Sequence, residues 1–128
     1  LALAAPQARA QQHAIRFEDF VSLRAVSDPQ PSRDGQSVLY AVRTADLTAN
    51  RRTGRTWIVS TASGAPRPWP AADVNASEAR WSPDGRRVAY VAGGQLWIAP
   101  VSGGAPKQLT NLTGGASTDS FVFSDGKA

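Results

Sequence analysis

The chain has 128 residues and a formal net charge of +4 at pH 7, and its lack of cysteine excludes disulfides, thiolate nucleophiles and cysteine metal sites. Its twelve arginines and two lysines are mostly scattered over expected turns and strand ends, without the clustering among exposed aromatic side chains that nucleic-acid binding needs. No apolar stretch is long enough to span a membrane as a helix, so we expect neither a nucleic-acid nor a membrane partner.

The first twelve residues have the features of the end of an export signal. An apolar start precedes Ala8-Arg9-Ala10, which fits an A-x-A cleavage site, so cleavage before Gln11 is plausible. A disordered alanine-rich terminus is the alternative. We expect residues 1–12 to be a signal-peptide remnant and disordered terminus, and the protein to be periplasmic or secreted. The only histidine, His13, follows in a segment expected to be flexible, and we expect no functional role for it.

A short helix is predicted within residues 15–24, the first part of a helix-and-linker segment over residues 13–30. Its apolar side chains recur at helical spacing: Phe17, Phe20 and Val21. Acidic residues lie in the first turn and Arg24 in the last, as the helix dipole prefers. A helix this short needs a docking surface to be stable in water. The prolines of Val26–Pro31 then favour an extended linker that leads into the next domain.

Residues 79–110 have the pattern of one complete four-stranded antiparallel sheet. Trp81 ends a first strand, and the following turn contains Asp84 and Gly85, where glycine accepts a positive φ. Strands over 87–92 and 95–101 are joined by Gly93-Gly94, which suits a two-residue hairpin turn. A short edge strand over 106–110 completes the sheet.

This pattern repeats along the chain. Trp57 matches Trp97 at an offset of 40, and Tyr40 matches Tyr90 at an offset of 50. The turn residues Asp34 and Gly35 match Asp84 and Gly85, also at an offset of 50. A third, shortened copy begins at Phe123-Ser124-Asp125-Gly126. Repeats of 40 to 50 residues with four strands each are typical of β-propeller blades.

We therefore predict an all-β fold, a β-propeller fragment with a short N-terminal helix. The expected propeller covers residues 31–128, with blade 1 at about 31–70, blade 2 at about 77–110 and the start of a third at about 119–128. A small β-sandwich is the alternative, but it would show polar residues on one face, whereas 87–92 is apolar on both. We expect Trp57 and Trp97 to be equivalent and largely buried between blades. Propellers close with four to eight blades, so the chain has the features of a piece of a longer protein.

Tyr40 to Trp57 is ten residues longer than Tyr90 to Trp97, so we expect a long loop in blade 1. Three arginines cluster in or beside it: Arg51, Arg52 and Arg55. We interpret them as part of a solvated loop, with a contact to substrate or to another anion as the alternative.

The segment Phe17 to Val42 resembles the amino-terminal start of the prolyl oligopeptidase family of serine peptidases, in its acylaminoacyl-peptidase and dipeptidyl-aminopeptidase branch found in bacteria. Val26-Ser27-Asp28-Pro29-Gln30 is the more specific signal, because the W-S-P-D-G motif at Trp81 to Gly85 also occurs in Tol-type periplasmic propellers. The resemblance covers about residues 14–128. It departs from the family pattern at Arg33, where proline is usual, and in the shortened third copy.

The resemblance implies a carboxy-terminal α/β-hydrolase domain that carries Ser, Asp and His, with the serine in a G-x-S-x-G motif. The chain lacks this motif, so we expect no catalytic residue, metal or cofactor in it. The propeller would cap the hydrolase domain and limit access to short peptides, and Phe17, Phe20 and Val21 would dock on that domain, or on another copy in a homo-oligomer. Only Glu78 and Asp73 are nearby acids, which leaves the peptide specificity open.

Two other functions stay open at this point. One is a non-enzymatic periplasmic propeller that serves as a protein-interaction scaffold. The other is a propeller with a sugar or quinone site in its channel, which would need calcium-binding acids or stacking tryptophans. The sequence after Ala128 would separate the peptidase from the scaffold, because only the peptidase continues into a hydrolase domain.

Overall fold

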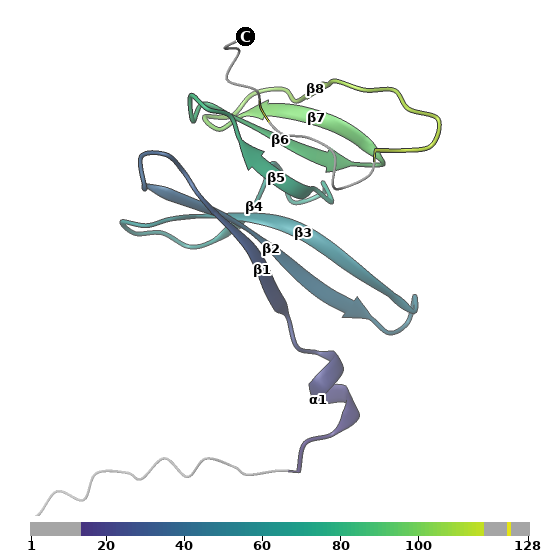
Figure 1. Cartoon of the computed structure of the whole chain (residues 1–128). Helices are drawn as coiled ribbons and strands as arrows, with labels where there is room; N and C mark the ends of the chain where they lie inside the picture. Colours follow the sequence, from purple (N-terminus) through teal and green to yellow (C-terminus); the bar gives the residue numbers. More distant parts are fainter. Residues whose placement is uncertain (1–13, 117–122, 124–128) are drawn as a thin grey trace, which may run out of the picture.

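The computed structural model describes residues 14–116 and residue 123, and it contains two four-stranded antiparallel sheets preceded by one short helix (Figure 1). The helix is α1 (Phe17–Val21). The first sheet, called blade 1 from here on, has the strand order β1 (Ala25–Pro31), β2 (Ser37–Asp46), β3 (Arg51–Ser60) and β4 (Arg67–Pro68). Blade 2 has the order β5 (Ser77–Trp81), β6 (Arg87–Ala92), β7 (Gln95–Pro100) and β8 (Lys107–Gln108). Each sheet is a meander in chain order, which confirms the predicted propeller fragment with two blades that do not close into a ring.

The two blades repeat each other residue by residue. Tyr40 lies opposite Trp57 across β2 and β3, and Tyr90 lies opposite Trp97 across β6 and β7. The pairing register shifts within both first strands, between Ser27 and Gln30 in β1 and between Ser77 and Arg80 in β5. A residue with positive φ stands in each shift, Asp28 (53°) and Glu78 (55°), at the offset of 50 that relates the two turns. The irregularity is therefore part of the repeat.

The turn that follows each first strand is held by one serine and one aspartate. In blade 2 the Ser82 hydroxyl donates to Asp84 Oδ1 and accepts from the Arg87 amide at 3.0 Å. Blade 1 repeats the pattern with Ser32 and Asp34, whose side-chain oxygens are 2.6 Å apart. These serine hydrogen bonds, followed by one from a backbone amide, hold the pKa of both aspartates below its usual value.

The Asp84 turn should therefore lose stability at acid pH. Because the folded-state pKa of Asp84 is lowered, its contribution is present above the unfolded-state value of about 4 and is lost as pH falls through the folded-state value. We expect Ser82→Ala to raise the Asp84 pKa, measured by NMR titration of its carboxyl carbon. Asp34, whose own serine is intact, is the internal control, and equal behaviour of the two aspartates in the variant would contradict this account.

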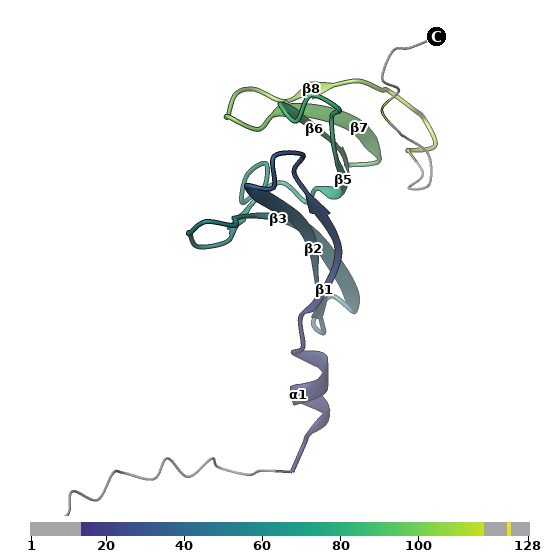
Figure 2. The ribbon, with the colours of Figure 1, turned by 60° about the vertical axis from the view of Figure 1, so that its left-hand side comes forward.

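The ten additional residues of blade 1 lengthen its central hairpin instead of forming a loop. Pairing between β2 and β3 continues without interruption from Ser37 opposite Ser60 to Asp46 opposite Arg51, and only residues 47–50 form the turn. The three clustered arginines lie in β3, so the interpretation of a solvated loop is wrong. The reason is composition, because Thr44, Ala45 and Thr53 allow the pleated ladder to continue past the blade. Figure 2 shows this hairpin extending toward α1.

The segment before the first turn also differs from expectation. Val26–Pro31 belongs to β1, so blade 1 begins at Ala25 and not at about residue 31. β1 pairs only with β2, and an edge strand tolerates prolines because their missing N–H leaves no ladder bond broken. α1 ends at Val21, so Arg24 lies outside it and does not complement its last turn. The expected signal remnant, His13 and most of the third blade copy lie outside the described residues.

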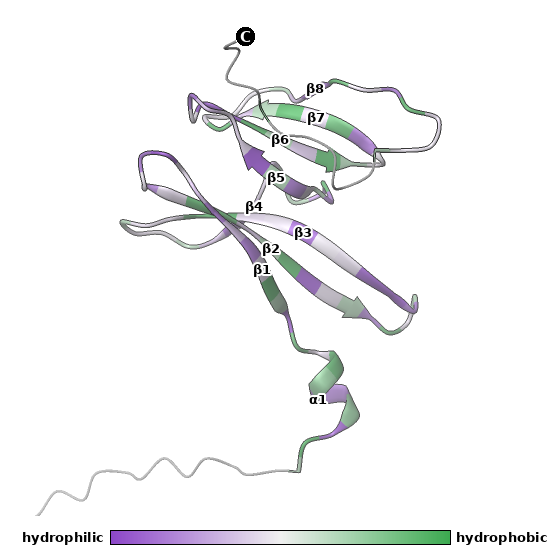
Figure 3. Cartoon of the chain, viewed as in Figure 1, coloured by the Kyte–Doolittle hydropathy of each residue, from purple (hydrophilic) through white to green (hydrophobic). Residues whose placement is uncertain are grey.

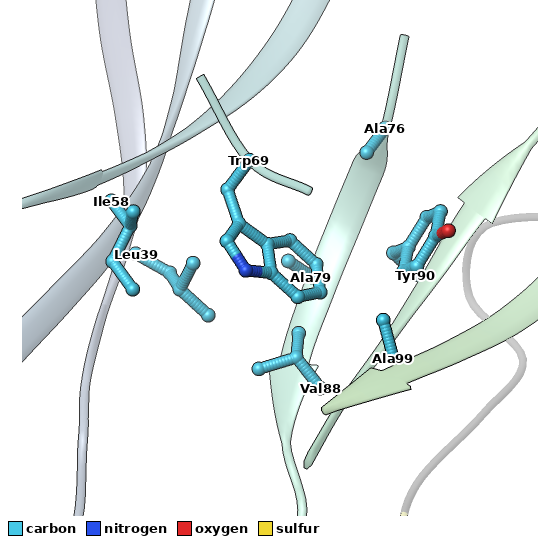
Figure 4. Packing of buried hydrophobic residues seen from close by; sticks show 8 residues of the cluster. All are labelled: Leu39, Ile58, Trp69, Ala76, Ala79, Val88, Tyr90 and Ala99. Atoms are coloured by element: carbon cyan, nitrogen blue, oxygen red, sulfur yellow. The ribbon is translucent and has the colours of Figure 1, made fainter. Parts of the chain in front are cut away.

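The core lies between the two blades, where eight buried side chains meet (Figure 4). Trp69, in the connection after β4, is 2% exposed, and its ring meets Tyr90 edge to face with centroids 5.4 Å apart. The remaining members come from both sheets: Leu39, Ile58, Ala76, Ala79, Val88 and Ala99. Burial raises the pKa of Tyr90, because the charged phenolate is poorly solvated there. Aromatic edge-to-face contacts stabilise such cores beyond their buried area.

Trp57 and Trp97 are partly buried, which is less than we expected. In β3, Trp57 alternates with Ile58, and it is Ile58 that faces the core between the blades. The face with Trp57 points to the side where a preceding blade would lie, and blade 2 does not cover that face. In β7, Trp97 packs against the edge of the core and donates its indole N–H to the Ala92 carbonyl at 3.2 Å.

Candidate functional site

Among the described residues, the acidic side chains bear on the question of a metal-ligand cluster, and the helix on that of a membrane-spanning segment. Within residues 14–116 and residue 123, no group of three or more His, Cys, Asp or Glu side chains could hold a metal ion. In the same part of the chain no helix is long and apolar enough to cross a membrane. The two nearby acids are separate features, since Asp73 lies exposed between the blades and Glu78 is the partly buried bulge residue of β5.

A groove of about 330 Å³ lies between α1 with its following residues and the end of the long hairpin nearest its turn. We call it the helix–hairpin groove. Figure 3 shows α1 mostly in the colour of apolar residues, and Phe17 and Phe20 are 69% and 66% exposed. All three predicted docking residues line the groove on the helix side. The full lining is Phe17, Phe20, Val21, Leu23, Ala25, Arg43, Thr44, Ala45 and Arg52.

The pairing register assigns the hairpin residues to two faces. Ala45 lies opposite Arg52 and Arg43 lies opposite Gly54, so these residues share one face of the hairpin. The alternate face carries Asp46 opposite Arg51, and Thr44 opposite Thr53 with their hydroxyl oxygens 3.0 Å apart. Because Arg43, Ala45 and Arg52 all line the groove, their face is the groove wall opposite the helix. The sequence analysis missed this wall, since strand alternation becomes readable only once the arginines are placed in β3.

The clustered arginines have different roles. Arg55 is structural, because its guanidinium donates to the Ala72 carbonyl at 2.7 Å and to Asn75 Oδ1 at 3.1 Å, which fixes the connection between the blades. Arg52 and Arg43 are exposed, and the side chain of neither makes a hydrogen bond or ion pair with any residue in the described part of the chain. The groove therefore combines apolar side chains with two uncompensated positive charges.

A polar clasp joins the first strands of the two blades. Arg80 forms an ion pair with Asp28 at 2.6 Å, and the Trp81 indole N–H donates to the Gln30 carbonyl at 2.8 Å. Partial burial raises the pKa of Asp28, but hydrogen bonds from Arg80 and Gln30 together with the Arg80 charge outweigh it, so the net pKa is lowered. The bulge at Asp28 thus positions its carboxylate for the neighbouring blade.

Comparison with known proteins places this arrangement among peptidases. Residues 32–125 match the family described as the dipeptidyl peptidase IV N-terminal region. The uncharacterized peptidase YuxL of Bacillus subtilis is 31% identical over 108 residues, which cover 80% of this chain and 16% of that protein. The chain thus spans about one sixth of the length of this relative.

Two solved structures share the fold. An acylaminoacyl peptidase from Pyrococcus horikoshii superposes with a TM-score of 0.63 at 24% identity, over 73% of this chain and 15% of that one. The β-propeller domain of the Trilobed protease from Pyrococcus furiosus superposes with a TM-score of 0.56 at 25% identity, over 71% of this chain and 28% of that one. Both include the two-blade arrangement within a longer chain.

Proposed function

Because this chain belongs to the family of dipeptidyl peptidase IV N-terminal regions, we propose that the whole protein is a serine peptidase of the prolyl oligopeptidase family. In this proposal the two blades belong to a propeller that covers a separate catalytic domain and limits entry to short peptides. The observation that carries it is the family match over residues 32–125, which contains strands β2 to β8 of two consecutive propeller blades. The catalytic serine, its base and the peptide specificity belong to residues outside this chain.

The composition of the chain supports the proposal that the catalytic residues lie in a separate domain. A serine nucleophile needs a neighbouring base to accept its proton, which is usually histidine. The chain has one histidine, His13, which precedes the described blades. The blades present packed apolar strands, turn residues and an interblade clasp, which are the parts of a scaffold. Their contribution is to shape the entrance to the active site.

The exposed helix supports a contact with the catalytic domain. Phe17 and Phe20 present phenyl groups on a five-residue helix that has no buried side chain. Exposed apolar clusters of this kind are typical of interaction surfaces. We assign the helix to the interface between the propeller and the catalytic domain. We also assign the protein to the periplasm or the medium, since its first residues fit the end of an export signal.

Peptide hydrolysis tests the proposed activity. The whole protein should cleave short chromogenic peptides, cleave long unfolded polypeptides far more slowly, and be blocked by a serine-directed inhibitor. The 128-residue chain alone should show no turnover under the same conditions. Acylated and free N-termini on otherwise identical peptides would reveal the specificity. Inhibitor-sensitive turnover by the 128-residue chain, or equal rates on short and long substrates, would contradict the proposal.

A further inference from the structure

We infer that the helix–hairpin groove binds an acidic, apolar surface of the catalytic domain, with Asp or Glu side chains of that surface pairing with Arg43 and Arg52. The inference rests on the proposed function, because it specifies the chemistry of the interface between the two domains. The proposed occupant of the groove is thus the catalytic domain of the same protein.

The first argument is the balance of charge on the two faces of the hairpin. On the alternate face of the hairpin, Asp46 stands directly opposite Arg51. On the groove face, Arg52 stands opposite Ala45, and Arg43 opposite Gly54, so no carboxylate compensates either arginine across the strands. The acidic residues of α1 do not line the groove. A partner surface that carries carboxylates would neutralise both guanidinium groups, which no side chain across the hairpin does.

The second argument is the geometry of the wall. Gly54 has no side chain, and Arg43 extends across it, where a Cβ at Gly54 would lie 3.8 Å from Arg43 Cγ. The guanidinium groups of Arg43 and Arg52 thus come from one flat strand face, beside the phenyl groups of α1. Arginine suits such an interface, because its planar group pairs with carboxylates through two hydrogen bonds and is weakly hydrated.

The third argument concerns the alternative occupant. A second copy that packed the same groove against this one would place the same patch on both sides of the interface, and the only charged side chains lining that patch are again Arg43 and Arg52. Like charges placed together across an interface are strongly unfavourable. An acidic surface on another domain avoids this repulsion and buries the phenyl groups at the same time.

Hydrogen exchange in the whole protein tests the inference. Amides of residues 17–25 and 43–53 should exchange slowly, because the catalytic domain covers them. Arg52→Glu should speed that exchange about tenfold at low salt, as expected when an interfacial charge pair becomes repulsive. Arg67→Glu is the matched control, since Arg67 is also exposed, lies in the same blade, and its side chain makes no hydrogen bond or ion pair within the described residues. Arg52→Lys keeps the positive charge but loses the two-bond geometry, so its protection should lie between that of wild type and that of Arg52→Glu.

Salt and concentration complete the experiment. In 1 M NaCl the difference between Arg52→Glu and wild type should shrink, because screening weakens exposed pairs. Protection of residues 88–91 in β6 reports that each variant is folded. Equal effects of Arg52→Glu and Arg67→Glu would overturn the inference, as would protection that rises with protein concentration, which would assign the groove to a second copy. If Phe17→Ala with Phe20→Ala uncovers residues 43–53 while Arg52→Glu does not, the docking in the proposed function stands and the acidic partner is wrong.

Discussion

Trp69→Ala should lower the free energy of unfolding of the two-blade unit by about 3–5 kcal/mol, the range for truncating a buried large aromatic side chain. Trp69 is 2% exposed and comes from the connection between the blades. Its ring contacts Tyr90 edge to face, and its amide donates to the carbonyl of the buried Thr56 at 2.9 Å. Removing the indole would leave a cavity between the sheets. Neither sheet can close it alone, because the backbone hydrogen bonds within each sheet fix the positions of its strands.

The matched control is Trp57→Ala, which removes the same side chain from a partly buried position in β3. We expect a cost of about 1–2 kcal/mol there, because partial exposure reduces both the transfer and the cavity contributions. Both variants would be compared in the whole protein by the urea dependence of hydrogen exchange at residues 88–91, which avoids assuming two-state unfolding of several domains. A larger effect for Trp57 than for Trp69 would contradict the described core.

Phe17→Ala with Phe20→Ala should loosen the contact between the propeller and the catalytic domain while hardly changing the stability of the blades. Burying one phenyl group contributes about 1.5–3 kcal/mol, so losing two should weaken the contact at least tenfold. In the whole protein, cleavage of long polypeptides should rise relative to that of short peptides. Measuring kcat/KM for both substrate classes gives the ratio directly.

Leu112→Ala provides a control for that double substitution. Leu112 is also an exposed apolar residue, at 49%, but it follows β8 of blade 2 and does not line the helix–hairpin groove. Its replacement should leave the substrate ratio unchanged. If the phenylalanine double variant instead unfolds the blades, α1 belongs to the propeller core and its assignment to the interface between domains is wrong.

Much of the fold was predictable because its turns depend on local chemistry. Gly93 and Gly94 have φ values of 57° and 70°, as a primed hairpin turn requires. Such turn residues mark where the strands of blade 2 begin and end. β6 is buried on both faces, as its apolar pattern predicted. The repeat offsets of 40 and 50 then transferred the same assignment to blade 1, including the Ser32 and Asp34 turn.

The remaining features depend on contacts between distant segments. Trp69 stands in a proline-rich connection with no periodic pattern, so its burial follows only from the way blade 2 packs on blade 1. The bulge at Asp28 could not be read from a segment whose prolines favoured an extended linker. The groove required the register of β2 and β3, which separates Arg52 from its sequence neighbour Arg51 by assigning them to opposite faces. The signal that identifies an arginine of the groove wall is its pairing register: it stands at an exposed strand position, and no carboxylate lies opposite it.

A serine-directed fluorophosphonate probe tests the central claim most directly. The whole protein would be labelled, digested and mapped by mass spectrometry, alongside a sample saturated with a short peptide substrate as competitor. We predict a single labelled serine, in a G-x-S-x-G segment after residue 128. The competitor should reduce its labelling. Deletion of the residues that line the helix–hairpin groove should reduce labelling less than loss of that serine does. Labelling of a serine within residues 1–128, or no labelling of a protein that cleaves peptides, would contradict the claim.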